Sequence, residues 1–186
     1  SVHDTKSVSF KSAAAHGRDA FTINEVMDPG ALYRGIIFHW DGASGYHMVW
    51  DPMTLGVVNV HALGGALVWT ETELGSSKTG TSIYRAPWPR SNATLAPTLV
   101  RKIESKSEGE SALAAGQLAL QEHDRINLVQ LDNGAHRTVF VAKPWTTSGV
   151  LLTERSLNIV MFDNPNTNIH ISVRVKLSDV LALPTD

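Results

Sequence analysis

The most constraining feature of this sequence is the alternation of apolar and polar residues near its end. From Ile169 to Leu177 every odd position is Ile, Val or Leu and every even position is His, Ser, Arg or Lys. Such a period of two places one face of a β-strand against a core and leaves the other face polar. The preceding run Leu157–Phe162 is separated from it by Asp163–Asn168, rich in turn-forming Asn, Asp and Pro. We therefore expect a closing pair of strands, with the apolar set in the core and the polar set facing water or a neighbouring molecule.

The rest of the chain also has the pattern of short strands and turns. Short apolar runs are separated by turn signals, and no long run has the 3.6-residue period of an amphipathic helix. The strongest turn is Asp132–Gly134, which predicts a hairpin between strands at 125–131 and 136–143. Gly64–Gly65 is expected to mark a bulge or bend in one long strand, 111–119 to begin as a helical turn, and 145–149 to be a loop. The pattern predicts an all-β protein with antiparallel sheets, a sandwich or a barrel.

Composition excludes several classes of function. The chain has 186 residues, no Cys and a net charge of -2, with basic residues dispersed along it. The lack of Cys excludes disulfides, thiolate catalysis and zinc sites that need Cys. No apolar run approaches the roughly 18 residues of a membrane span, and Ser1–Ser7 does not have the pattern of a signal peptide. We expect no membrane partner.

No motif predicts a catalytic or cofactor site, and we expect neither an enzyme nor a bound metal. His39, His47, His61 and His123 have no recognised ligand spacing. Gly75–Gly80 has Lys78–Thr79 but not the glycine that a phosphate-binding loop needs before the lysine. Gly42–Tyr46 does not match the nucleophile elbow, because Tyr46 stands where its final glycine should be.

Two other features concern surfaces. Asn92-Ala-Thr94 is a glycosylation sequon, which matters only in a secreted protein. Trp40, Trp50 and Trp69 fall in expected strands and are predicted to lie in a core or an interface. Trp88 and Trp145 fall in expected loops, where a buried support and an exposed protein-binding anchor remain equal alternatives.

Three passages carry a resemblance to a known family: Thr54–Leu63 with Val68–Ser77, Thr138–Trp145, and the closing strand pair continued to Val180–Pro184. Together they resemble the small jelly-roll coat proteins of plant picorna-like viruses, the comovirus, nepovirus and cheravirus relatives. The resemblance implies one eight-stranded jelly roll over residues 1–186, with an N-terminal arm over about 1–20 and a C-terminal tail over about 178–186.

The same resemblance implies a function and partners. The chain would be a structural capsid subunit, assembled in the host cytoplasm with other coat protein subunits into an icosahedral virion around single-stranded RNA. It implies release from a polyprotein, which would account for Ser1. An alternative rests on Ala114–Leu128, which resembles a strand of the trimeric C1q/TNF recognition domains, although Glu122-His123 replaces an expected glycine. A cupin-type enzyme ranks last because the sequence has no cluster of His and Glu ligands.

Overall fold

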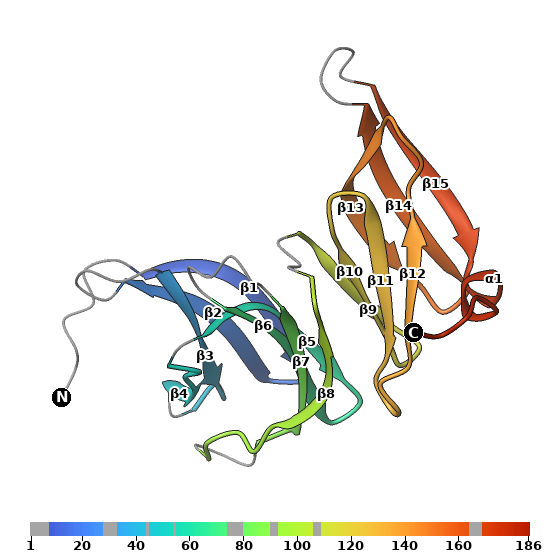
Figure 1. Cartoon of the computed structure of the whole chain (residues 1–186). Helices are drawn as coiled ribbons and strands as arrows, with labels where there is room; N and C mark the ends of the chain where they lie inside the picture. Colours follow the sequence, from blue (N-terminus) through green and yellow to red (C-terminus); the bar gives the residue numbers. More distant parts are fainter. Residues whose placement is uncertain are drawn as a thin grey trace. The chain divides into compact units, whose positions relative to one another are not determined.

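The computed structural model describes most of the chain, in eight segments. The described residues are 8–27, 33–43, 45–53, 55–73, 80–89, 93–105, 109–163 and 169–186. They form antiparallel β-sheets and one short helix (Figure 1). The chain folds into two compact units, Ser1–Lys106 and Ser107–Asp186, where the sequence led us to expect a single domain. We call them unit 1 and unit 2 and describe each by itself.

Unit 1 contains two four-stranded sheets, each with its strands hydrogen-bonded in the order of the sequence. The first sheet, sheet A, consists of β1 (Val8–His16), β2 (Asp19–Met27), β3 (Tyr33–Trp40) and β4 (Tyr46–Trp50). The second, sheet B, consists of β5 (Leu55–Leu63), β6 (Ala66–Glu73), β7 (Thr81–Pro87) and β8 (Thr98–Ile103). Strand β5 packs against β1, β2 and β3, so the first strand of sheet B covers one face of sheet A.

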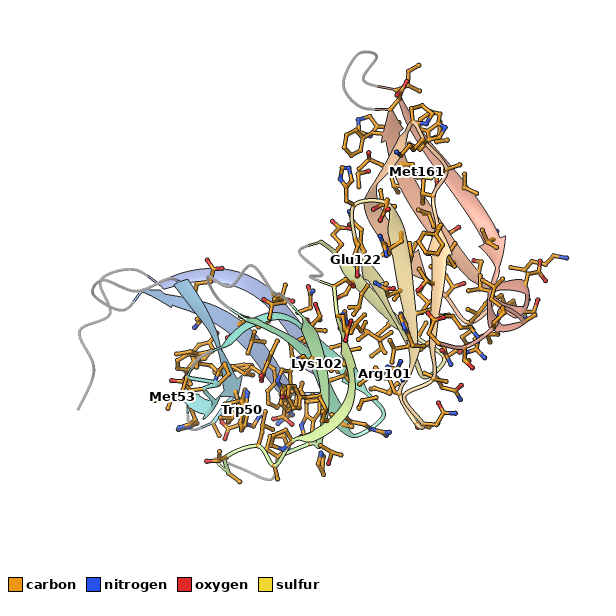
Figure 2. The ribbon with its side chains drawn as sticks, viewed as in Figure 1. Trp50, Met53, Arg101, Lys102, Glu122 and Met161 are labelled. Carbon is orange, nitrogen blue, oxygen red and sulfur yellow. The ribbon has the colours of Figure 1, made fainter. Side chains whose placement is uncertain are left out.

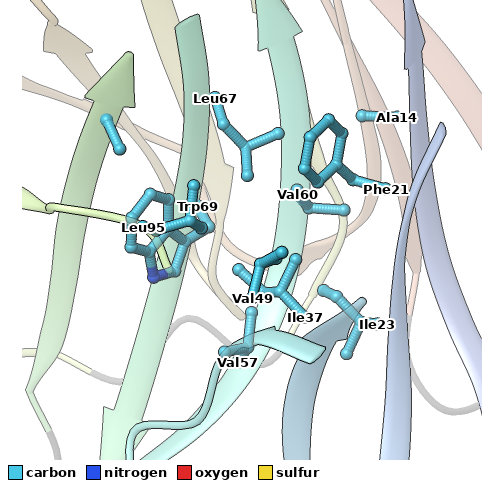
Figure 3. Close-up of a cluster of buried hydrophobic side chains, with 11 residues drawn as sticks. Ala14, Phe21, Ile23, Ile37, Val49, Val57, Val60, Leu67, Trp69 and Leu95 are labelled. Atoms are coloured by element: carbon cyan, nitrogen blue, oxygen red, sulfur yellow. The ribbon is translucent and has the colours of Figure 1, made fainter. Parts of the chain in front are cut away.

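The core of unit 1 lies between these two sheets. Figure 3 shows Phe21, Ile23 and Ile37 of sheet A facing Val57, Val60, Leu67 and Trp69 of sheet B, and all seven are buried. The sheets approach closely at Gly35, where a Cβ atom would collide with the carbonyl oxygen of Val57 and touch Ile23. Only glycine permits this approach of β3 to β5.

Unit 2 repeats the construction with a four-stranded and a three-stranded sheet. Sheet C consists of β9 (Ser111–Ala114), β10 (Gln117–Gln121), β11 (Arg125–Gln130) and β12 (His136–Phe140). Sheet D consists of β13 (Trp145–Leu152), β14 (Ser156–Asp163) and β15 (His170–Lys176), followed by α1 (Leu177–Leu181). Strand β13 packs against β9, β10 and β11, and the core between the sheets includes Ile126, Leu128, Leu157 and Ile159.

The prediction of an all-β chain with antiparallel sheets is confirmed, and the single eight-stranded jelly roll is not. A jelly roll contains Greek keys, in which a strand pairs with one far away in the sequence. Every hydrogen-bonded strand pair in the described residues joins strands that follow each other along the chain. Alternation identifies strands but carries no information on their pairing, which explains this difference.

Several local predictions are settled by the strand register. The Asp132–Gly134 hairpin is confirmed, because β11 pairs with β12 across it and Gly134 has a φ of 70°. Gly64–Gly65 is a hairpin turn between β5 and β6 rather than a bulge, with φ of 44° and 81°. The expected helical turn at 111–119 is wrong, since β9 and β10 pair there around Ala115–Gly116. The expected loop at 145–149 belongs to β13 instead.

The ends of the chain also differ from the jelly-roll expectation. Within the expected arm, residues 8–16 form β1, which pairs with β2. Helix α1 spans residues 177–181 and so includes the first residues of the expected tail, and Val180 is buried in the core of unit 2. The closing strand pair is confirmed, because β14 pairs with β15 from Ser156–Lys176 to Phe162–His170.

The predicted outward set of β15, His170, Ser172, Arg174 and Lys176, is exposed. The apolar residues that alternate with this set along the chain are less buried than expected. Leu177 is in the core, Ile171 and Val175 are half-buried, and Ile169 and Val173 are exposed. Strand β15 is an edge strand of sheet D, so its apolar side is only partly covered.

Candidate functional site

The histidines considered as metal ligands do not assemble into a site. His39 on β3 lies directly opposite His47 on β4, His61 lies on β5, and His123 precedes β11. Among the described residues, no group of three or more His, Asp or Glu side chains is placed to hold a metal ion. Burial lowers the pKa of His61.

His39 is buried in unit 1 against the ring of Phe21. Its side chain is 2% exposed and stacks on Phe21 at 4.6 Å with the ring planes 6° apart. Its Nε2 atom lies 3.4 Å from Asp19 Oδ1, but it is not oriented to form a hydrogen bond. Trp88 donates its indole N–H to Asp19 Oδ2 at 3.0 Å and meets Phe21 edge to face. The loop residue Trp88 is therefore a half-buried support, which decides between the two alternatives for this residue.

A buried carboxylate forms the polar centre of unit 1. Glu71 on β6 is 2% exposed, and its Oε1 atom accepts two indole N–H bonds, from Trp50 at 2.6 Å and from Trp69 at 2.8 Å. Trp69 is fully buried and stacks on Tyr84 of β7. Trp50 comes from β4, so Glu71 joins the two sheets of unit 1. Figure 2 labels Trp50 within unit 1 and Met53 beyond the end of β4.

The electrostatics of this centre follow from burial. Removal from water raises the pKa of Glu71, and the hydrogen bonds from Trp69 and Trp50 oppose the shift without cancelling it. The pKa of Tyr84 is also raised, first by burial and then by the negative charge of Glu71, while a hydrogen bond with Ser82 lowers it. The two indoles hold the carboxylate in place, which is a structural role.

Unit 2 has a different polar centre, a buried amide. Asn127 on β11 is 2% exposed and donates through Nδ2 to Glu122 Oε1. The carboxylate can only accept, so this bond orients the amide and turns its Oδ1 toward His136 Nε2, 2.9 Å away. Thr138 donates to the same oxygen at 3.2 Å. Glu122, labelled in Figure 2, follows β10, so the amide links a turn to two strands.

The network extends from the amide at both ends. Arg125 Nε lies 3.5 Å from the second oxygen of Glu122. At the other end, His136 Nδ1 lies 3.6 Å from Asp186 Oδ2, and the backbone N–H of Asp186 donates to the His136 carbonyl. The Asn127 amide is shielded from solvent, so we assign the network to fixing the β10–β11 turn and strand β12.

A third arrangement is partly exposed: Thr22 in it is buried and Ala20 and Phe38 are half-buried, but three large apolar side chains are exposed. The face of sheet A that points away from sheet B carries two cross-strand rows, Ala20–Trp40–Tyr46 and Thr22–Phe38–Met48. Trp40, Tyr46 and Met48 are 40%, 64% and 57% exposed. We call these two rows the outer face of sheet A. The exposed side of an antiparallel sheet is normally polar, so a row of large apolar side chains is typical of a contact surface.

Sequence reasoning missed the residues at these centres. Glu71 follows the apolar run of β6 in the polar stretch Thr70–Glu73, so it resembles an ordinary polar residue at the end of a strand. Asn127 alternates with Ile126 and Leu128 in β11 and resembles an outward residue. Trp50 and Trp69 were the only sequence signal of the centre at Glu71, because a buried Trp usually needs a hydrogen-bond acceptor. Trp145 is half-buried on β13 against the core of unit 2.

Other predicted features lie outside the described residues. These are Asn92 of the sequon, residues 75–79 of the loop with Lys78–Thr79, Ser44 of the elbow-like stretch, and Ser1–Ser7. Among the described helices, none is long and apolar enough to cross a membrane.

Comparison with known proteins gives a likeness in structure alone. No family model matches the chain, and no curated protein matches it in sequence. A structure from a study of two prolyl endopeptidases, concerned with inter-domain dynamics in catalysis and specificity, superposes with a TM-score of 0.56 at 15% identity. The match covers 89% of this chain and 26% of that chain, so this chain spans about a quarter of the endopeptidase.

A second similar structure is the endo-arabinase from Bacteroides thetaiotaomicron, with a TM-score of 0.38 and 13% identity over 89% of this chain and 73% of that one. At these identities the first likeness concerns the arrangement of the strands and not the chemistry.

Proposed function

We propose that this chain is a non-catalytic assembly module made of stacked antiparallel sheets, and that it binds a second copy through the outer face of sheet A. The observation that carries the proposal is the exposure of Trp40, Tyr46 and Met48 on neighbouring positions of β3 and β4. Trp, Tyr and Met are enriched in protein interfaces, and a Trp at the centre of an interface often dominates its binding energy.

We infer that the outer face of sheet A binds a β-sheet of the second copy. Within unit 1, the opposite face of sheet A is covered by the first strand of sheet B, and within unit 2 the first strand of sheet D covers sheet C in the same way. A face with apolar cross-strand rows suits a further layer of this kind, because pleated faces interdigitate at a spacing of about 10 Å.

For the finer fold, we propose that the two sheets within each unit are neighbouring blades of the β-propeller type. Propeller blades are four-stranded antiparallel sheets, and sheets A, B and C are four-stranded meanders. The likeness to the prolyl endopeptidase supports this sheet architecture, and its low identity carries no peptidase activity to this chain.

The capsid-subunit function stays a prediction, as does the C1q/TNF-like trimer. Both are assembly functions and agree with an apolar face that binds further copies. The sequential strand order supports stacked meander sheets more directly than it supports the Greek keys of a jelly roll.

Sedimentation over a range of protein concentrations tests the proposal. We expect the average mass to rise with concentration above the 20.2 kDa of one chain. Trp40→Lys and Tyr46→Lys should each weaken self-association by about 10-fold or more, because each places a charge in an apolar contact. Leu99→Lys is the matched control, since Leu99 is a similarly exposed apolar residue on β8 of the same unit.

A monomer at every concentration, or self-association that Trp40→Lys leaves unchanged, would contradict the proposal. Megadalton particles that contain RNA would favour the capsid prediction instead. A discrete trimer would favour the C1q/TNF-like alternative.

A further inference from the structure

One end of sheet D, at the start of α1, contains a hollow of about 760 Å³. It lies entirely within unit 2, where α1 follows β15 in Figure 1. Eight residues line it: Glu154, Arg155, Ser156, Arg174, Lys176, Leu177, Ser178 and Leu181. We call it the β15–α1 hollow. Its volume falls within the range of roughly 300–1,000 Å³ that is typical of small-molecule sites.

The backbone brings three cationic side chains to this hollow from two directions. Arg174 and Lys176 are two residues apart on β15 and therefore share one face of the strand. They pair in register with Asn158 and Ser156 of β14. Arg155 comes from the turn between β13 and β14, so the cations lie at two sides of the same opening.

The charges around these cations decide what the hollow can bind. Within the described part of the chain, no carboxylate lies within ion-pairing distance of Arg155, Arg174 or Lys176. The lining includes one carboxylate, Glu154, so three positive and one negative side chain leave a local charge of +2. The whole chain carries a net charge of -2, so the positive charge is a local feature of this end of sheet D.

The turn that carries Arg155 is held in position by hydrogen bonds. Thr153 Oγ1 accepts from the backbone N–H groups of Arg155 at 3.3 Å and Ser156 at 3.0 Å. The N–H of Leu177 donates to the carbonyl of Arg155 at 2.9 Å, which joins the turn to the first residue of α1. A ligand would therefore meet a backbone that is already ordered, which reduces the entropic cost of binding.

The remaining lining residues indicate what the uncharged part of a ligand would be. Leu177 is buried and Leu181 is half-buried, so the hollow has an apolar wall beside its cationic rim. Guanidinium groups match the planar oxygen pairs of phosphate and carboxylate, and a local charge of +2 matches a dianion. We propose that the β15–α1 hollow binds a small phosphate monoester that has an apolar substituent. The site is separate from the outer face of sheet A and does not depend on the proposed assembly.

Phenyl phosphate is a suitable probe, measured by titration calorimetry and by amide chemical shifts of the full chain. We expect saturable binding, with shifts confined to the hollow, and no binding of phenol, which has no anionic group. Arg174→Gln and Lys176→Gln should each weaken binding by about 10-fold or more, as expected for the loss of a charge-assisted hydrogen bond. Binding should also weaken at about 1 M salt, where the screening length falls to roughly 3 Å.

Two variants separate this site from general attraction of anions. Lys143→Gln removes the same charge from an exposed position of unit 2 and should leave the affinity unchanged. Leu181→Asn should weaken the binding of phenyl phosphate more than that of inorganic phosphate, since it alters only the apolar wall. The absence of binding, equal losses in Lys143→Gln and Arg174→Gln, or full affinity in a variant that carries both Arg174→Gln and Lys176→Gln would overturn the proposal. Unchanged melting temperatures would show that each variant is folded.

Discussion

Unit 1 and unit 2 are built by the same rule but stabilise their interiors with different polar chemistry. In each unit the first strand of the second sheet covers the first sheet. Unit 1 buries a carboxylate, Glu71, between two indole donors, whereas unit 2 buries a neutral amide, Asn127, between a carboxylate and an imidazole. The difference shows that the sheet arrangement does not dictate the polar centre.

The units also differ in what they expose. Sheet A exposes an aromatic and apolar face, and the outer side of β15 in sheet D exposes His170, Ser172, Arg174 and Lys176. The first suits a dry contact with another sheet, and the second contributes two cations to a small-molecule hollow. Two units of one construction thus carry two different kinds of surface.

The largest effect should come from the close approach of the two sheets of unit 1 at Gly35. Gly35→Ala places a methyl group against the Val57 carbonyl and Ile23, so β3 and β5 must separate. Overpacking of this kind costs about 3 kcal/mol of the free energy of unfolding. Urea denaturation followed by tryptophan fluorescence measures it.

Gly17→Ala is the control for this substitution. Gly17 has a φ of 62°, but nothing lies within 4 Å of the place that a new methyl group would occupy. It should lose only about 1 kcal/mol, from backbone strain. Equal losses in the two variants would mean that the close approach of the sheets is not the cause.

The second largest loss of stability should come from changes at the polar centre of unit 2. Asn127→Ala leaves Glu122, His136 and Thr138 without the amide that they share. Unsatisfied buried groups cost about 1–3 kcal/mol each, so we expect a loss of about 2 kcal/mol and faster amide exchange in β11 and β12. Asn158→Ala removes an amide with only long contacts of 3.4 and 3.5 Å and should cost less than about 0.5 kcal/mol. A similar loss in both variants would remove the distinction between the two amides.

The smallest effect concerns the buried carboxylate at the polar centre of unit 1. The folded state binds a proton at Glu71 more tightly than the unfolded chain does, because burial raises the pKa above 4.5. The contribution of Glu71 to stability is therefore greatest below pH 4.5 and decreases as the pH rises through its raised pKa, by at most about 1.4 kcal/mol per pH unit.

Glu71→Gln should abolish this part of the pH dependence, as measured by urea denaturation at a series of pH values. Glu104→Gln, which removes an exposed carboxylate of the same unit, serves as the control. A Glu71→Gln variant that keeps the slope of the wild-type protein would show that another group is responsible.

Much of the strand pattern was predictable from local signals. The apolar runs 46–50 and 55–63 predict strands, and both are strands in the structure. Residues 98–103 stand out only as an apolar segment in a region expected to be rich in loops, and they form β8. The wrong predictions also come from local signals. Ala and Leu favour helix and therefore predict a helical turn at 111–119, but the pairing of β9 with β10 overrides that preference. The residues of the candidate sites were predictable only in part, as exposed polar positions on β15 were expected and the hollow beside them was not.

The sequence by itself determined that this protein is all-β, with short strands, glycine-containing turns and no cysteine chemistry. It did so because alternation and turn residues act within a few neighbouring positions. Only the tertiary structure decided that the strands pair in sequential order, that Gly35 meets Val57, and that Glu71 lies between two indoles. The Trp50–Glu71 and Gly35–Val57 contacts join residues on different strands, 21 positions apart in the first case, so no local pattern encodes them. An alternating pattern is also compatible with more than one order of strand pairing, and with a face that is exposed to water or covered by another sheet. The alternation of Ile169–Leu177 therefore predicts a strand, while its position at the edge of sheet D determines which of its apolar residues are buried.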